Sequence, residues 1–170
     1  MRSGGNPRIL FGAVAGLVLV VDLVTKALIE SSFSLGQVRA VAGEWVQLRL
    51  VYNPGAAFGL NLGPYSRWIF LVIAILALGV LWRVARKTDP TDWFRMLSLG
   101  LVAGGATGNL VDRIRHAHGV VDFLDVGVGS MRWPTFNVAD MGVTVGAIAL
   151  AISLWMEDSR RGQERASAAT

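Results

Sequence analysis

The sequence contains no cysteine, and this absence removes several kinds of chemistry at once. Disulfide bonds, thiol nucleophiles and thiolate metal sites all need that residue. Histidine is scarce too: His116 and His118 stand one residue apart in a polar stretch, and no HExxH or other spaced His/carboxylate pattern accompanies them. The simpler interpretation is two solvated loop histidines, so neither a metal site nor a cofactor is expected.

Charge is also scarce. Only 16% of the residues are charged, whereas 53% are hydrophobic. A soluble domain usually has more charge and less apolar sequence, so a membrane protein is expected. The length of 170 residues fits one domain over residues 1–170, without room for a second domain of ordinary size.

Four apolar segments are long enough to cross a hydrocarbon core, which needs about 20 residues of helix. They run approximately over residues 8–29, 67–85, 93–111 and 138–156. The first could instead be a cleaved signal peptide, because a short apolar stretch follows Arg2 and Arg8. No small-x-small cleavage site follows Val21, however, and the apolar pattern resumes after Asp22. A retained helix is therefore the preferred interpretation.

Lysine and arginine indicate how these helices are oriented, because short cytoplasmic flanks are enriched in them. If four helices alternate, three basic stretches lie on one side: the N-terminal tail, the connection after the second segment and the C-terminal tail (Arg2, Arg8; Arg83, Arg86, Lys87, Arg95; Arg160, Arg161, Arg165). That side is expected to be the cytoplasm, with both termini there and the two longer connections outside. This topology explains the net charge of +4, so no nucleic-acid partner is predicted.

The first outer connection contains a strand signature. In EWVQLRLVY, the residues Val46, Leu48, Leu50 and Tyr52 alternate with polar residues, which is typical of a half-buried strand. One strand alone is not stable, so a small sheet is expected in the region of about residues 40–60. The predicted fold class is therefore an all-α polytopic membrane protein with four transmembrane helices and a small extracytoplasmic β-sheet.

Ionisable residues gather at helix ends that this topology places outside. Asp22 and Lys26 are four residues apart and share one helix face, and Asn109, Asp112 and Arg113 share a face of the third segment. Charged groups at membrane depth are costly and usually mark function. Both clusters should lie at the same membrane level, although Asp22 and Lys26 could also serve only to anchor a helix end.

Three further aspartates follow along the chain. Asp140 is the third residue of the last helix if Asn137 is its N-cap, a place where the helix dipole favours a carboxylate for structural reasons alone. Asp122 and Asp125 stand among Val, Phe and Leu at no obvious cap, although a strand or turn edge facing water would accommodate them. Two carboxylates that share a site divide acid and base roles, because both cannot ionise easily. Asp122 and Asp140 are candidates, since the loop between them is long enough to fold back.

Glycines form two groups. Gly100, Gly104, Gly105 and Gly108 on the third segment predict close packing between helices. Gly55 and the small residues after it either let backbone approach a substrate or only make a tight turn, and the sequence leaves both interpretations open.

Five short motifs, in this order, resemble the lipoprotein signal peptidase family, also called signal peptidase II. They are DLVTK (22–26), YNPGAAFG (52–59), GNLVDR (108–113), VVDF (120–123) and FNVAD (136–140), and they extend over nearly the whole chain. The resemblance implies an aspartic endopeptidase of the bacterial inner membrane, with both termini cytoplasmic and an outer sheet that forms a substrate cradle. Such an enzyme removes the signal peptide from diacylglyceryl-modified prolipoproteins by cutting just before the lipidated cysteine.

The resemblance also implies roles for individual residues. The catalytic dyad falls on Asp122 and Asp140, and substrate-binding or supporting positions fall on Asp22, Lys26, Asn53, Gly55, Asn109, Asp112, Arg113 and Asn137. Leu23 departs from the pattern, because many members have glutamine there. The implied partners are prolipoprotein substrates and membrane lipid, with a monomer as the working form and cyclic peptide antibiotics of the globomycin type as inhibitors.

Two other classes of membrane protein fit the sequence less well. A small transporter or channel subunit would place its acids near the bilayer midplane to relay protons or bind cations, whereas these acids stand at helix ends. A presenilin-like intramembrane protease would need a GxGD pattern within a helix, and the sequence has none.

Overall fold

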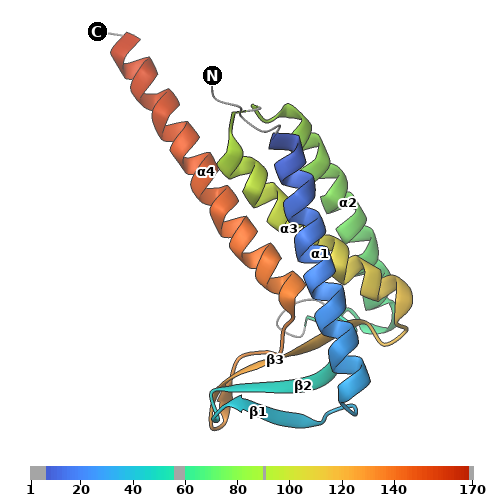
Figure 1. The fold of residues 1–170 in the computed structure, drawn as a ribbon. Helices are drawn as coiled ribbons and strands as arrows, with labels where there is room; N and C mark the ends of the chain where they lie inside the picture. Colours follow the sequence, from blue (N-terminus) through green and yellow to red (C-terminus); the bar gives the residue numbers. More distant parts are fainter. Residues whose placement is uncertain (1–6, 56–59, 90, 169–170) are drawn as a thin grey trace.

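The fold is a bundle of helices with a small sheet at one end (Figure 1). The computed structural model describes residues 7–55, 60–89 and 91–168. Its elements are α1 (Pro7–Ser32), β1 (Val38–Ala42), β2 (Val46–Asn53), the 3-10 helix η2 (Gly63–Tyr65), α2 (Ser66–Lys87), α3 (Trp93–Arg115), β3 (Val120–Val128), β4 (Met131–Arg132) and α4 (Val138–Ala168). The start of α1 and the end of α4 both lie at the end of the bundle away from the sheet. The predicted fold class is confirmed.

The third helix differs from the other three in how it meets the membrane. Among the described helices, α1, α2 and α4 are long and apolar enough to span a membrane, but α3 is not apolar enough. All four predicted segments are helices, and α3 is the least apolar of them. The physical reason is that α3 packs against α1, α2 and α4, so that much of its surface contacts protein instead of lipid. Its inward positions are therefore free to carry glycine, alanine and polar residues.

Glycines on α3 bring its backbone close to two neighbouring helices. A Cβ atom on Gly104 would lie 2.6 Å from the carbonyl oxygen of Ala15 on α1. On the other side of α3, a Cβ atom on Gly105 would collide with the carbonyl oxygen of Ala139 on α4. The prediction of close helix packing through these residues is confirmed.

The sheet is antiparallel, with the strand order β1-β2-β3-β4. The predicted strand around residues 46–52 is confirmed as β2, and the small sheet is confirmed with it. For the acidic VVDFLDV stretch, a strand or turn edge facing water was one of the interpretations left open, and the stretch is the mostly buried strand β3. Five of its first six residues are buried, so the alternation of buried and exposed positions that marks a half-buried strand is missing.

An apolar cluster attaches the sheet to the bundle. Ile29 and Phe33 at the end of α1 pack with Leu50 of β2 and with Val121 and Phe123 of β3. This cluster fixes the position of β3 relative to α1.

The chain enters β3 through a glycine that no other residue could replace without strain. Gly119 has a φ of 106°, and the backbone of Asn53 leaves no room for a side chain there. The tight connection places the start of β3 beside the end of β2.

Replacing Gly105 with valine should lower the free energy of unfolding by at least about 1–3 kcal/mol, because the new side chain would collide with α4 backbone. Gly79→Val on α2 is the matched control, since a Cβ atom at Gly79 meets nothing within 4 Å. Thermal unfolding of both variants in detergent measures the difference. Equal midpoints would contradict a tight contact between α3 and α4.

Candidate active site

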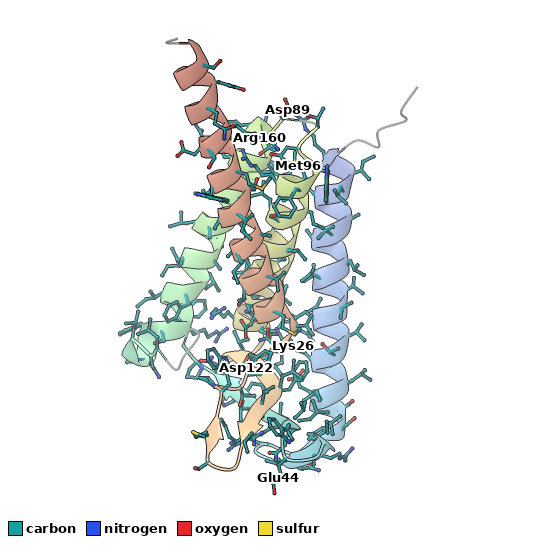
Figure 2. The ribbon with its side chains drawn as sticks, turned by 90° about the vertical axis from the view of Figure 1, so that its left-hand side faces the viewer. Lys26, Glu44, Asp89, Met96, Asp122 and Arg160 are labelled. Atoms are coloured by element: carbon teal, nitrogen blue, oxygen red, sulfur yellow. The ribbon has the colours of Figure 1, made fainter. Side chains whose placement is uncertain are left out.

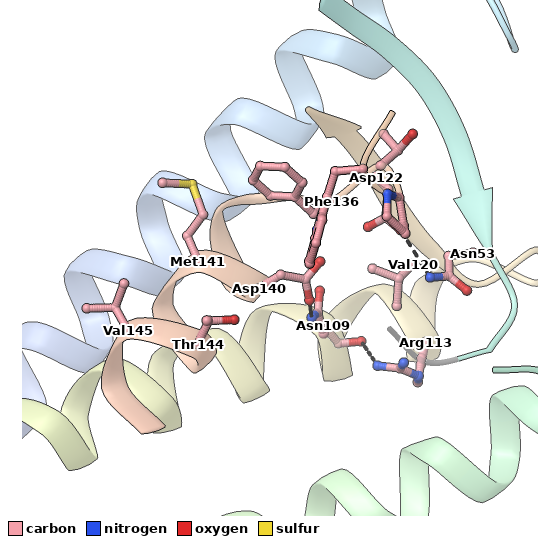
Figure 3. Close-up of a pocket in the computed structure, with 13 residues that line it drawn as sticks. Asn53, Asn109, Arg113, Val120, Asp122, Phe136, Asp140, Met141, Thr144 and Val145 are labelled. Carbon is pink, nitrogen blue, oxygen red and sulfur yellow. Dashed lines mark hydrogen bonds between the residues drawn. The ribbon is translucent and has the colours of Figure 1, made fainter. Parts of the chain in front are cut away.

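Asp122 and Asp140 line one pocket, which we call the dyad pocket, at the junction of the bundle and the sheet (Figure 3). Its volume is about 330 Å³. Its polar side chains are Asn53, Asn109, Arg113, Asp122, Thr135, Asp140 and Thr144, and its apolar walls include Val120, Trp133, Phe136, Met141 and Val145. The pocket therefore has a polar part around the two aspartates and an apolar part beside it.

Asp122 is buried on β3 and is held by two amide groups. Asn137 donates from Nδ2 to Oδ1 of Asp122 at 2.7 Å, and Asn53 donates from Nδ2 to Oδ2 at 3.1 Å. Burial raises the pKa of Asp122 from 3.8 to about 7, and the nearby charge of Asp140 acts in the same direction against the two amide donors. Asp122 therefore keeps its proton up to nearly neutral pH.

Asp140 lies in the first turn of α4, in a different environment. Its backbone N–H donates to Oδ1 of Asn137 at 2.8 Å, and its Oδ2 accepts from the backbone N–H of Asn137 at 3.3 Å. This reciprocal pair is a capping box, so the predicted N-cap at Asn137 and the predicted place of Asp140 are both confirmed. The positive end of the helix dipole favours an ionised carboxylate here.

Asn137 connects the two aspartates through its side-chain amide. Its Nδ2 group donates to Asp122 while its Oδ1 accepts from the N–H of Asp140. The side chain is fully buried. The relative position of the two carboxylates therefore depends on one amide group.

A buried ion cluster, formed by Asp22, Lys26 and Asp112, lies directly behind the dyad. The Nζ atom of Lys26 is 2.7 Å from Oδ2 of Asp22 and 2.8 Å from Oδ2 of Asp112, and each side chain is at most 2% exposed. Figure 2 shows Lys26 at the same level of the molecule as Asp122. The prediction that the α1 and α3 clusters lie at one level is confirmed.

The two acids of this ion cluster also position the elements that carry the dyad. Asp22 accepts through Oδ1 from the backbone N–H of Ala139 in α4 at 2.9 Å. Asp112 accepts through Oδ2 from the backbone N–H of Val121 in β3 at 3.1 Å. Each N–H group belongs to the residue next to a dyad aspartate.

The side-chain amide of Asn109 links Lys26 to Asp140 in the pocket by hydrogen bonds. Its Oδ1 accepts from Nζ of Lys26 and from Nδ2 of Asn137, each at 3.1 Å. With Oδ1 occupied in this way, the Nδ2 group is directed to Asp140, where it donates to Oδ1 at 2.8 Å. The positive charge of Lys26 therefore fixes which end of this amide faces Asp140.

Arg113 holds the turn after β2 against the pocket. Its Nη2 group donates to the carbonyl oxygen of Gly55 at 2.8 Å, and its Nη1 group donates to that of Asn109 at 3.1 Å. Gly55 in turn donates its N–H to Oδ1 of Asn53 at 3.0 Å, and a side chain at Gly55 would collide with backbone of Leu60. The small residues of the motif at 56–59 lie outside the described residues.

Other polar residues singled out in the sequence lie elsewhere. Asp125 is buried on β3 but forms an ion pair with Arg132 at 2.6 Å and does not line the dyad pocket. His118 is exposed as predicted, whereas His116 is partly covered, with Nδ1 3.3 Å from Glu30. In the described part of the chain, no group of three or more His, Cys, Asp or Glu side chains is placed to hold a metal ion.

The pocket residues that follow Asp140 are not among those that the sequence indicates. Met141, Thr144 and Val145 line the dyad pocket from α4. A signal for one of them was present, because Thr144 follows Asp140 by four residues and so shares its helix face.

Comparison with known proteins gives consistent matches over most of the chain. Residues 14–156 match the family described as signal peptidase (SPase) II. A lipoprotein signal peptidase of Maridesulfovibrio salexigens is 40% identical, with 88% of this chain and 97% of that protein covered. Another from Rhodococcus jostii is 42% identical, with 93% and 80% covered.

Solved structures agree with these matches. A bacterial membrane enzyme solved at 2.3 Å by the in meso method has a TM-score of 0.81 at 30% identity and covers 89% of this chain and 90% of its own. A second, solved at 1.9 Å, has a TM-score of 0.76 at 31% identity, with 85% and 92% covered.

Replacing Lys26 with methionine should cost about 3–5 kcal/mol of unfolding free energy, because Asp22 and Asp112 would stay buried without their cation. Arg161→Met is the matched control: it removes a cation from Glu157 at a site where Arg161 is 67% exposed, which should cost less than about 1 kcal/mol. Denaturant unfolding in detergent compares the two. A similar small loss in both variants would contradict the central role of the ion cluster.

Proposed function

This chain belongs to the signal peptidase II family, and from that membership we propose that it is an aspartic endopeptidase acting on diacylglyceryl-modified prolipoproteins. The family cleaves signal peptides from prolipoproteins. The proposal adds that Asp122 and Asp140 carry out the hydrolysis and that the cut falls just before the lipidated cysteine. The observation that carries it is the pair of aspartates, joined through Asn137, in one pocket.

The two aspartates take different roles in this mechanism. Asp140 is the general base that removes a proton from water as the water attacks the scissile carbonyl carbon. Asp122 donates a hydrogen bond and then its proton to the carbonyl oxygen, which gives a neutral tetrahedral intermediate. Asp140 then passes the proton it took to the leaving amine, while the intermediate returns a proton to Asp122 as the carbonyl reforms. No covalent enzyme intermediate is formed.

The environments of the two residues support this division. The start of α4 and the donor group of Asn109 stabilise an ionised Asp140. Burial favours the protonated form of Asp122, whose pKa of about 7 is well above that of an ordinary aspartate. Asp122 can therefore hold a proton at pH values up to about 7, as the acid of a general acid and base pair requires.

The supporting residues act mainly through the dyad. Asn53 and Asn137 hold Asp122, and Asn109 with Lys26 holds Asp140. Arg113 fixes the turn at Gly55, whose missing side chain leaves room for the backbone of Leu60. In this proposal every residue of the reaction comes from one chain, which supports a monomer as the working form.

We also propose that the sheet faces outward and that both termini are cytoplasmic, in an inner-membrane protein. In Figure 2, the labels of Asp89 and Arg160 mark the α2–α3 connection and the last part of α4, and both lie at the end of the molecule away from the sheet. The basic residues of these two segments therefore lie at that end, and cytoplasmic flanks are enriched in such residues. The dyad then stands at the outer membrane boundary. A lipidated substrate can keep its acyl chains in the bilayer while its scissile bond enters the pocket. Cyclic peptides of the globomycin type are expected to compete with it there.

Asp122→Asn and Asp140→Asn should each lower kcat/KM by about a thousandfold or more, because each variant loses one proton-transfer group. The assay is cleavage of a synthetic diacylglyceryl prolipoprotein by purified, folded protein, with the cut located by mass spectrometry. Asp125→Asn is the matched control, with the same change on the same strand outside the pocket. Full activity in either dyad variant would refute the assigned chemistry.

The pH dependence of cleavage should follow the proton on Asp122. Because this residue must be protonated to act, kcat/KM should fall as the pH rises above about 7. The donor group of Asn53 favours the ionised form of Asp122, so Asn53→Ala should move the alkaline limb to higher pH. An alkaline limb unchanged in that variant would contradict the assignment to Asp122.

A further inference from the structure

A second pocket, which we call the basic pocket, lies at the end of the bundle away from the sheet. Its volume is about 850 Å³, and its lining residues fall within 87–95 and 153–161, at the α2–α3 connection, the start of α3 and the last part of α4. Figure 2 shows two of them, Asp89 and Arg160, at the opposite end of the molecule from Asp122. The described residues that line it differ from those of the dyad pocket, so the basic pocket is a separate site.

Tryptophan side chains place this pocket at the level of a membrane surface. Trp82 on α2, Trp93 on α3 and Trp155 on α4 are all exposed toward this end of the bundle, and Trp93 lines the pocket itself. Tryptophan is enriched where the apolar core of a bilayer meets the headgroups. A molecule in the basic pocket therefore stands at headgroup depth, on the cytoplasmic side in the topology proposed above.

Part of the charge in the basic pocket is neutralised within the protein. The guanidinium group of Arg95 lies 2.6 Å from Glu157 and 3.4 Å from Asp92. Glu157 also forms an ion pair with Arg161. Two arginines are thus matched by two acids, and these contacts join the start of α3 to α4.

Two cations remain on different walls of the pocket, Lys87 at the end of α2 and Arg160 on α4. Both side chains are exposed, and neither forms an ion pair or a hydrogen bond with the parts of the chain that the structure describes. The acid not paired with an arginine is Asp89, whose Oδ1 accepts the backbone N–H and the hydroxyl of Thr91, each at 2.7 Å. The lining therefore holds four basic and three acidic side chains, and its excess positive charge lies on Lys87 and Arg160.

The lining fits an amphipathic anion better than a small one. Trp93, Phe94 and Met156 contribute apolar surface to the same pocket, and an inorganic anion would leave this surface uncovered. A phospholipid brings a phosphate for the cations and acyl chains for the apolar side chains. Basic pockets between transmembrane helices on the cytoplasmic side bind headgroups in this way. A zwitterionic headgroup adds a cation, which Lys87 and Arg160 would repel, so an anionic lipid is favoured.

We propose that the basic pocket binds an anionic phospholipid of the inner leaflet, with its phosphate between Lys87 and Arg160 and the first part of its acyl chains against Trp93 and Met156. The chains continue into the bilayer between α2 and α4, which both pack on α3 but have little contact with each other. The bound lipid links the α2–α3 connection to α4, whose last part extends beyond the other helices (Figure 1). It therefore stabilises the cytoplasmic end of the bundle, far from the dyad.

The test measures thermal unfolding of the purified full chain in a neutral detergent, with added phosphatidylglycerol or phosphatidylcholine of the same acyl chains. Phosphatidylglycerol should raise the unfolding midpoint of the wild-type protein by roughly 2–5 °C more than phosphatidylcholine does. Lys87→Gln/Arg160→Gln should lose most of this difference. Arg83→Gln/Arg86→Gln is the matched control, because it removes two exposed cations at the same end of the bundle but outside the pocket.

Native mass spectrometry of the same samples counts the lipid molecules that each protein retains. One phosphatidylglycerol should remain on the wild type and on the control, and none on Lys87→Gln/Arg160→Gln. Three results would overturn the proposal: an equal effect of both double variants, which would indicate diffuse attraction to anionic lipid; an equal gain from inorganic phosphate; or no preference for phosphatidylglycerol in the wild type. Both readouts are independent of peptidase activity, so failure of the proposed function would leave this test intact.

Discussion

The candidate site depends on the two ion pairs that the ammonium group of Lys26 forms. This group is shared by Asp22 on its own helix and Asp112 on α3, and both acids also accept a backbone N–H, from α4 and from β3. Each buried acid therefore has a backbone N–H donor besides the shared cation, and one of these N–H groups lies in the first turn of α4. One cation thereby joins the four elements α1, α3, β3 and α4 at the point where the dyad is built.

The dyad obtains two different carboxylates from two different kinds of local structure. Asp122 stands in a buried strand, where loss of solvent disfavours its charge and raises its pKa. Asp140 stands at a helix start, where backbone N–H groups and the dipole favour charge. Asn137 contacts both, so the same amide that sets their separation also belongs to the helix cap. Strand and helix must therefore meet at one residue for the pair to form.

The distribution of polarity along the bundle agrees with a reaction at the membrane boundary. The dyad, the ion cluster and the sheet lie at one end, and the apolar surfaces of α1, α2 and α4 extend away from them. The central helix α3 contributes Asn109, Asp112 and Arg113 while its glycines allow close contact with its neighbours. The pocket repeats this pattern on a small scale, with amides and carboxylates around the dyad and apolar side chains of α4 beside it.

The sequence by itself determined the features that depend on neighbouring residues in the chain. Apolar length predicted all four helices, alternation predicted β2, the spacing of Asp22 and Lys26 predicted their pairing, and Asn137 with Asp140 predicted a helix start. The motifs then indicated the family and, through it, the dyad. Only the tertiary structure decided that α3 is the central helix, that VVDFLDV is a buried strand, and that Asp122 lines the pocket while Asp125 pairs with Arg132. Residues three apart in a strand point to opposite faces, but burial on both faces removed the alternation that would have identified that strand. Such choices depend on contacts between distant segments, which local spacing does not contain.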